Sequence, residues 1–417
     1  MAPARQLPTS CCGRWSSSLR IALLAMTEPA GAGQPFPRAF LRVAGASVAQ
    51  HQLGMALALD CQRVICMARG TSPELIALQH DAENAGLQFT IATGPGQLAG
   101  LVTATDELVV ISEGLFADPS QAVALLEGRA PVVLVQPVEG ALVAGFERID
   151  INRASAGLMR IPGELVERLH ELPADCDVLS ALTRIALQIG IAMREVPAAA
   201  RAGSGWRMIR SEAEAYALED EWLRSRFGEG TCGSPGRAVA RFGVLSFGSS
   251  LLHAGNASNV VSIAVLVSIA IAAGLGWFGL VWGGFVFVAV AWLLVEASRL
   301  LRAAEREALG QPAPAIPRAD ALVWLVDAAF AAMILLDTPR FPGEPVLAWL
   351  CTPAILMMTL VLLPRVTGGR AVGWAGDRAL LGAVLAVASG FGQVLLVVRL
   401  LSVVLLAAAL LPPRRNG

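Results

Sequence analysis

The sequence predicts two domains of different class: an α/β domain built on a mostly parallel sheet, followed by an all-α membrane domain of about six helices. Hydrophobic residues make up 55% of the 417 residues, which is high for a soluble protein of this size. Charged residues recur every few positions up to about Gly236, but from Val260 to Leu411 they are confined to short stretches between long apolar runs. Short β-branched segments alternate with helical patterns only in the first part, which is typical of an α/β domain.

Four apolar segments in the first part have the length and composition of buried strands. Helical patterns at residues 48–59 and 72–85 lie between them. This alternation predicts βαβ units on a parallel sheet, in which ligands bind at the carboxyl ends of the strands. The predicted strands are residues 20–25, 63–67, 107–112 and 131–136.

The segments that flank this domain have their own patterns. Residues 1–18, which contain Pro, Ser and Cys, are expected to form a disordered leader. The apolar run at 21–26 is too short for the core of a signal peptide and is expected to be a β-strand. Residues 198–205 are expected to be a flexible linker, and residues 211–226 an amphipathic helix whose mixed charges favour packing against protein. The predicted domains are 19–200 for the α/β domain, 201–240 for the linker and amphipathic helix, and 241–417 for the membrane domain.

The second part supplies several apolar stretches near the length of about twenty residues that a membrane-spanning helix needs. Its last stretch, 379–411, is too long for one span, and Gly390-Phe391-Gly392 near its middle predicts a tight turn. Dividing the stretch there gives six spans. They are residues 260–275, 278–295, 321–336, 346–363, 379–390 and 393–411.

The arginines predict how these spans are oriented, because cytoplasmic loops carry an excess of positive charge. Groups of arginines precede the first span, follow the second and fourth, and end the chain, whereas only Arg340 lies in a loop on the other side. We therefore expect an inner (cytoplasmic) membrane protein whose α/β domain and two termini are cytoplasmic. The cytoplasmic arginines are Arg237, Arg241, Arg299, Arg302, Arg306, Arg318, Arg365, Arg370, Arg378, Arg414 and Arg415.

Composition argues against several kinds of partner. The formal net charge is −1, and every basic residue other than histidine is an arginine. No basic run with interleaved aromatic residues is present, so nucleic acid is not an expected partner. The seven cysteines form no CxxC pair and the four histidines are scattered, so neither a zinc site nor a disulfide framework is expected.

Ionisable residues inside the apolar stretches are costly and usually face a partner or a cavity. Glu296 lies at the end of the second span, Asp327 in the third and Arg399 in the sixth. An ion pair between Asp327 and Arg399 would be structural, whereas a cavity lined by them would suit a transporter or a lipid-binding protein. Transporters often contain inverted repeats, and the sequence shows no internal repeat.

Motifs at the start of the α/β domain follow one another in a characteristic order. The strand at 20–25 leads to a loop with Gly31 and Gly33, then to Pro37-Arg38, a helix and a second strand. Further on, residues 107–118 combine a strand with Glu113 and Asp118. Together with segments 156–162 and 180–186, this order resembles that of sugar-phosphate nucleotidyltransferases over residues 20–197.

The resemblance implies a Rossmann-like domain and nucleotidyl transfer, which needs a divalent ion and a cation at the α-phosphate. It implies that Gly31, Gly33 and Arg38 bind the nucleotide phosphates. It also makes Glu113 and Asp118 the metal candidates. The chain departs from the family in lacking the compact GxGxR loop, in having Arg38 in place of a lysine, and in having Glu113 at the metal-binding aspartate.

The fusion of such a domain to six spans resembles enzymes that make a CDP-activated polyol phosphate and transfer it with a CDP-alcohol phosphotransferase domain. The membrane part of that family holds two metals with the aspartates of DxxDGxxAR and GxxxDxxxD. The corresponding residues 292–306 contain Glu296 and Glu305 but no aspartate. Nine residues along a helix separate these two by roughly 13.5 Å, too far to share a metal cluster.

A scaffold without its metal ligands predicts a binding or assembly partner in phospholipid or polar-headgroup metabolism rather than a catalyst. The rival hypothesis is an active transferase that uses Mg²⁺ with CTP or a CDP-alcohol, and a third is the transporter or lipid-binding protein. The expected partners are membrane lipid and a nucleotide, with a homodimer by analogy. An active site in the rival would draw on Arg38, Glu113, Asp118, Asp150, Glu296, Arg299 and Asp327.

Overall fold

The computed structural model divides into two compact units. The sheet unit comprises Met1–Leu41 and Val48–Ser211, and the helical unit comprises Arg42–Ser47 and Glu212–Gly417. The leader 1–18 lies outside the residues that the structure describes. Those residues are 19–31, 36–128, 130–173, 176–228, 233–253, 257–308, 318–338, 340, 343, 345–366, 373–374 and 376–410.

A seven-stranded sheet forms the centre of the sheet unit, in the order β10-β8-β9-β6-β1-β4-β5. Neighbouring strands are parallel except in the two pairs that involve β9, so the predicted mostly parallel sheet is confirmed. The four predicted strands correspond to β1, β4, β6 and β8. The strands are β1 (Arg20–Met26), β4 (Arg63–Ala68), β5 (Gln88–Ala92), β6 (Glu107–Ile111), β8 (Val132–Pro137), β9 (Arg153–Pro162) and β10 (Ala192–Glu195).

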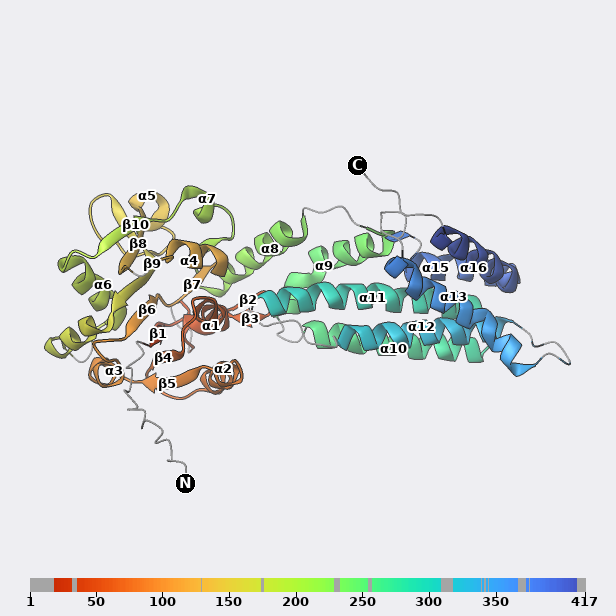
Figure 1. The fold of residues 1–417 in the computed structure, drawn as a ribbon, viewed down its shortest axis with the longest axis horizontal. Coiled ribbons are helices and arrows are strands. Elements are labelled where there is room, and N and C mark those ends of the chain that lie inside the picture. The colour runs from red at the N-terminus through yellow and green to blue at the C-terminus, as the bar shows by residue number, and fades with distance from the viewer. Residues whose placement is uncertain are drawn as a thin grey trace, which may run out of the picture. The chain divides into compact units, whose positions relative to one another are not determined.

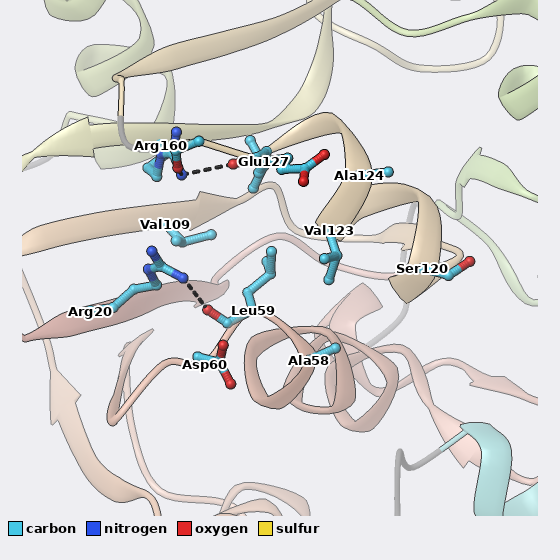
Figure 2. Close-up of a pocket in the computed structure, with 12 residues that line it drawn as sticks. Arg20, Ala58, Leu59, Asp60, Val109, Ser120, Val123, Ala124, Glu127 and Arg160 are labelled. Atoms are coloured by element: carbon cyan, nitrogen blue, oxygen red, sulfur yellow. Dashed lines mark hydrogen bonds between the residues drawn. The ribbon is translucent and has the colours of Figure 1, made fainter.

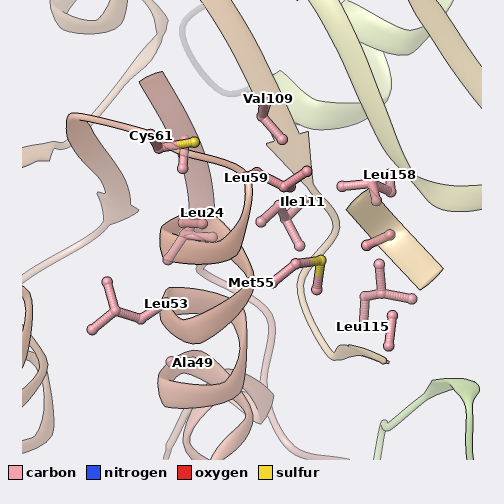
Figure 3. Close-up of a cluster of buried hydrophobic side chains, with 14 of the residues drawn as sticks. Leu24, Ala49, Leu53, Met55, Leu59, Cys61, Val109, Ile111, Leu115 and Leu158 are labelled. Atoms are coloured by element: carbon pink, nitrogen blue, oxygen red, sulfur yellow. The ribbon is translucent and has the colours of Figure 1, made fainter. Parts of the chain in front are cut away.

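Side chains along β1 alternate between two hydrophobic cores, one on each face of the sheet. Leu24 and Met55 belong to the cluster on one face (Figure 3), and Leu23 and Leu98 belong to the cluster on the other. Burial on both faces explains why β1 is a continuous apolar run. The first face is covered by α1 (Val48–Ala58), α2 (Pro73–Asn84) and α4 (Pro119–Leu125), and the second by α3 (Pro95–Leu101), the 3₁₀ helix η2 (Gly163–Glu171) and α6 (Val178–Gln188).

The segment predicted to be a flexible linker is folded. Residues 198–208 contain helix α7 (Ala198–Arg201) and strand β11 (Trp206–Met208), which pairs with β7 (Leu115–Ala117). Trp206 is buried, and its Nε1 donates a hydrogen bond to the carbonyl oxygen of Ala156 at 2.8 Å. This buried indole attaches the segment to the sheet. Two short helices, η1 (Arg38–Phe40) and α5 (Val138–Ala141), complete the unit.

Long helices form the second unit, and each of the six predicted spans coincides with one of them (Figure 1). The predicted turn at residues 390–392 is confirmed, because it separates two helices and Gly392 has a φ of +63°. A short hairpin of β2 (Arg42–Val43) and β3 (Ala46–Ser47) belongs to this unit. The helices are α8 (Glu212–Gly228), α9 (Pro235–His253), α10 (Ala257–Trp277), α11 (Val281–Ala308), α12 (Arg318–Asp337), α13 (Val346–Val366), α15 (Arg378–Gly390) and α16 (Val394–Leu410).

Among the described residues, three helices are long and apolar enough to cross a membrane: α10, α11 and α13. This supports membrane association but not the count of six spans. Helix α15 has 13 residues, or about 20 Å at 1.5 Å per residue, which is short of a hydrocarbon core of about 30 Å.

Small residues allow the helices of this unit to approach closely, as expected for membrane helices. A Cβ atom added at Gly382 of α15 would lie 2.6 Å from the Cβ of Ala289 and 3.2 Å from the carbonyl oxygen of Phe285 on α11. Helix α8 packs against other helices of the unit, since its Leu223 is buried in a cluster with Val244 of α9.

Candidate functional site

A cavity of about 230 Å³ lies at the carboxyl ends of β1 and β6, where parallel α/β sheets bind ligands. Thr27 follows β1, and Ser112 and Glu113 follow β6. We call this cavity the carboxyl-end pocket. Its charged and hydroxyl-bearing lining residues are Thr27, Glu28, Arg38, Ser112, Glu113, Glu147, Ser155, Asp177, Ser180 and Thr183.

Glu113 is the most deeply buried acid of the pocket, at 3% exposure. Its Oε2 accepts hydrogen bonds from the backbone N–H groups of Thr27 at 2.8 Å and Glu28 at 3.0 Å. Burial raises the pKa of Glu113 to about 7, although these hydrogen bonds and the charge of Arg38 act in the opposite direction. Its Oε1 is buried and has no hydrogen-bond partner among the described residues. The carboxyl group therefore changes charge near neutral pH.

Arg38 extends from η1 over Gly114 and forms an ion pair with Glu28, Nη2 to Oε2, at 2.7 Å. Its Nε is buried without a hydrogen-bond partner among the described residues. Gly114 has a φ of +84°, and a Cβ atom there would clash with the carbonyl oxygen of Ile209 and lie 3.3 Å from the Arg38 side chain. Glycine is required at this position because of both the backbone conformation and the close approach.

A second acidic centre, which the sequence did not predict, lines the same pocket. The Oγ of Ser180 lies 2.7 Å from Oε2 of Glu147 and 2.5 Å from Oδ2 of Asp177. Asp177 also caps α6 by accepting the backbone N–H groups of Leu179 and Ser180. The only sequence signal was this N-cap position at the start of an apolar helix; nothing in the sequence linked it to Glu147.

Of the predicted site residues that the structure describes, only Arg38 and Glu113 line the same pocket. Asp118 caps α4 by accepting the backbone N–H of Ser120 at 2.8 Å. Asp150 accepts the backbone N–H groups of Asn152 and Arg153, and Gly31 is exposed and does not line the pocket. Gly33 lies outside the described residues. Within the part of the chain that the structure describes, no group of three or more Asp, Glu, His or Cys side chains could hold a metal.

The charged residues of the helical unit form ion pairs, one of which corrects the sequence-based expectation. Asp327 pairs with Arg378, at 3.2 and 3.3 Å, and not with Arg399. The physical reason is position: Arg378 is buried at the start of α15, whereas Arg399 is exposed on α16. The guanidinium of Arg378 also lies 4.8 Å from the ring centre of Trp292.

Glu296 is buried on α11 and pairs with two arginines, Arg237 on α9 at 3.2 Å and Arg299 at 3.0 Å. Like Asp327, it is therefore neutralised within its own unit. The contact with Arg237 joins α9 and α11, which fits the structural interpretation of the buried charges.

A second cavity, of about 370 Å³, lies between α1 and α4 at the amino ends of the strands (Figure 2). Its two arginines are already bound by the protein. Arg20 pairs with Glu107 at 2.6 Å and donates to the carbonyl oxygen of Leu59, while Arg160 donates to the carbonyl oxygen of Leu126. Although it is larger, this cavity offers a ligand fewer open polar groups than the carboxyl-end pocket.

No protein family and no curated protein matches the chain. Among solved structures it is similar to a glucose-1-phosphate thymidylyltransferase from Bacillus anthracis, with 14% identity and a TM-score of 0.37 over 49% of this chain and 94% of that chain. It is also similar to the inositol-1-phosphate CTP transferase from T. maritima, with 13% identity and a TM-score of 0.37 over 49% and 96%.

Proposed function

We propose that this chain is a membrane protein of phospholipid or polar-headgroup metabolism that binds a small polar molecule in its nucleotidyltransferase-like domain and does not transfer a nucleotide. The observation that carries the proposal is the charge of the carboxyl-end pocket. Among the described residues that line it are four carboxyl groups, of Glu28, Glu113, Glu147 and Asp177, beside the guanidinium of Arg38.

This charge balance opposes the binding of a nucleoside triphosphate. Two like charges 4 Å apart repel by about 4 kcal/mol at an effective dielectric constant of 20, and Arg38 is already paired with Glu28. Nucleotidyl transfer needs cations around the phosphates, namely a metal ion and a basic side chain, and Arg38 is the one basic side chain among the described residues of the pocket. The pocket volume of about 230 Å³ also falls below the roughly 300–1,000 Å³ that drug-sized ligands occupy.

The membrane part of the proposal rests on α10, α11 and α13, which have the length and composition of spanning helices. We extend it to six spans because of the apolar stretches of the sequence, and we place the sheet unit and both termini on the cytoplasmic side of the inner membrane because of the arginine distribution. Membrane lipid is then the natural partner of the helical unit, and a homodimer is proposed by analogy only.

The second candidate function is an active transferase of nucleotide-activated headgroups. The observation that favours it is the pair of unpartnered buried atoms in the pocket, Oε1 of Glu113 and Nε of Arg38. Glu113 would bind Mg²⁺ and Arg38 would contact a phosphate. Mg²⁺ is usually held by one or two carboxylates together with substrate phosphates, so Glu113 would bind it only beside a bound triphosphate. The described residues contain no group of three acidic, His or Cys side chains that would hold the metal by themselves. The transporter hypothesis is weakened because Asp327 pairs with Arg378.

Calorimetry of the full-length protein in detergent, with CTP and CDP-alcohols in the presence and absence of Mg²⁺, tests the proposal when it is run beside a turnover assay. We expect no Mg²⁺-dependent turnover and no submillimolar CTP binding. Turnover that depends on Mg²⁺ and is lost in Glu113→Gln would establish the active transferase instead.

A further inference from the structure

We infer that the carboxyl-end pocket binds a small amino alcohol, a ligand that carries a primary ammonium group next to hydroxyl groups. This inference rests on the proposed function, since it names the class of molecule that the pocket holds. It follows from the pocket's charge, from one buried acceptor that lacks a donor, and from a serine shared by two carboxylates.

The charge of the pocket selects for a cation. Within the part of the chain that the structure describes, carboxyl groups of Glu28, Glu113, Glu147 and Asp177 line it, and Arg38 is the one basic lining residue. The guanidinium of Arg210 approaches Gly145 at the rim, but its Nη2 donates to the carbonyl oxygen of Val143. A cleft lined by one sign of charge concentrates ligands of the opposite sign.

Glu113 supplies the position for the ammonium group. Its side chain is 97% buried, its Oε2 is held by two backbone N–H groups, and its Oε1 has no partner among the described residues. Buried acceptors are almost always hydrogen-bonded, so this atom points to a ligand that donates. An ammonium group has three donors and no acceptor, which suits an oxygen with further carboxylates nearby.

The centre formed by Glu147, Ser180 and Asp177 supplies positions for hydroxyl groups. The Ser180 hydroxyl has one proton and two carboxylate oxygens within 2.7 Å, so it can satisfy only one of them at a time. A ligand hydroxyl can donate to the other. The neighbouring hydroxyl of Thr183 donates to the carbonyl oxygen of Leu179 and keeps its lone pairs for a ligand donor.

An organic cation fits these groups better than the other candidate ligands do. A bare divalent ion needs several carboxylates around one point, and the described part of the chain has no such group of three. A phosphate would be placed among carboxylates, with only the Glu28-paired Arg38 to bind it. A neutral polyol would leave the excess of negative charge uncompensated.

The experiment compares matched ligands on the full-length protein in detergent by calorimetry at pH 8. Serinol (2-aminopropane-1,3-diol) and glycerol have the same skeleton and differ by one ammonium group in place of a hydroxyl, and glycerol 3-phosphate is the anionic member of the series. We expect serinol to bind at least about tenfold more tightly than glycerol, a difference of about 1.4 kcal/mol, and glycerol 3-phosphate not to bind. Equal affinity for serinol and glycerol, or a preference for the phosphate, overturns the inference.

Variants locate the site. Glu113→Gln and Glu147→Gln are each expected to weaken serinol binding by about tenfold, while the exposed Glu164→Gln, on η2, leaves it unchanged. If serinol binds equally well to both pocket variants, the ligand lies elsewhere and the inference fails. The turnover assay separates the two proposals: CTP turnover refutes the proposed function, whereas absent turnover with no preference for serinol refutes only this inference.

Discussion

At the scale of single residues, the two most informative side chains are Glu113 and Arg38. Their positions were predicted from the order of motifs, but their environment was not. The structure shows Glu113 held by backbone N–H groups and Arg38 held by Glu28. These contacts position both side chains at the pocket and also reduce the positive charge that Arg38 can offer a phosphate.

Glu113 makes the stability of the sheet unit depend on pH. Its pKa is raised from the ordinary 4.5 to about 7 by burial, so the folded state binds this proton more tightly than the unfolded state does. Its stabilising contribution is therefore complete below pH 4.5 and is lost as pH rises through 7, by about 3 kcal/mol in all. The charged groups that act on Glu113 are Arg38 and Glu28. The neighbouring Cys66 thiol stays neutral, because burial raises its pKa.

We expect Glu113→Gln to remove this dependence. Between pH 4.5 and 8, the melting temperature of the unsubstituted protein should fall by roughly 5–10 °C more than that of the variant. Calorimetric or circular-dichroism melting of the full chain measures both. If the melting temperatures of the two proteins depended on pH in the same way, the pKa of Glu113 would not be raised in the folded state and the prediction would be wrong. Glu164→Gln serves as the control and should reproduce the unchanged profile.

At the scale of elements, the packing of α15 on α11 depends on a glycine. A Cβ atom at Gly382 would lie 2.6 Å from that of Ala289, whereas one at Gly274 of α10 would meet nothing within 4 Å. Both glycines lie inside helices, where alanine is intrinsically more favourable by about 1 kcal/mol. The two positions therefore form a matched pair.

We predict opposite effects for the two alanine substitutions. Gly382→Ala should destabilise the helical unit by about 1–3 kcal/mol, because overpacking forces the backbones apart, while Gly274→Ala should be neutral or slightly stabilising. Thermal unfolding in detergent, followed by intrinsic tryptophan fluorescence, measures both. If Gly382→Ala were as stable as Gly274→Ala, then α15 and α11 could not pack as closely as described.

At the scale of the whole molecule, the arginine distribution predicts which side of the membrane each segment faces. A cysteine introduced at Arg340 should react with a membrane-impermeant maleimide in intact cells, while a cysteine at the exposed Glu164 should react only after the cells are opened. The unsubstituted protein controls for its own cysteines. Labelling of the position-164 cysteine in intact cells would reverse the proposed orientation.

The sequence by itself determined the elements whose signal is local. The strand at 20–25 could be predicted because a strand that is buried on both faces of a sheet is a continuous apolar run. The helix of 346–363 could be predicted because a helix long enough to span a membrane is a longer run of the same kind. Both runs are visible in the residues themselves. The turn at residues 390–392 followed from its glycines in the same way. The edge strand β10 was missed because its residues are exposed and carry no such pattern.

Only the tertiary structure decided which charges meet. Asp327 and Arg378 are 51 positions apart and Glu147 and Ser180 are 33 apart, and no local pattern distinguishes Arg378 from Arg399 as the partner. Pairing depends on which helix faces lie together and on which side chain is buried there, since an unpaired buried charge is costly. The acidic character of the carboxyl-end pocket, on which both proposals rest, arises in the same way, from side chains brought together by the fold.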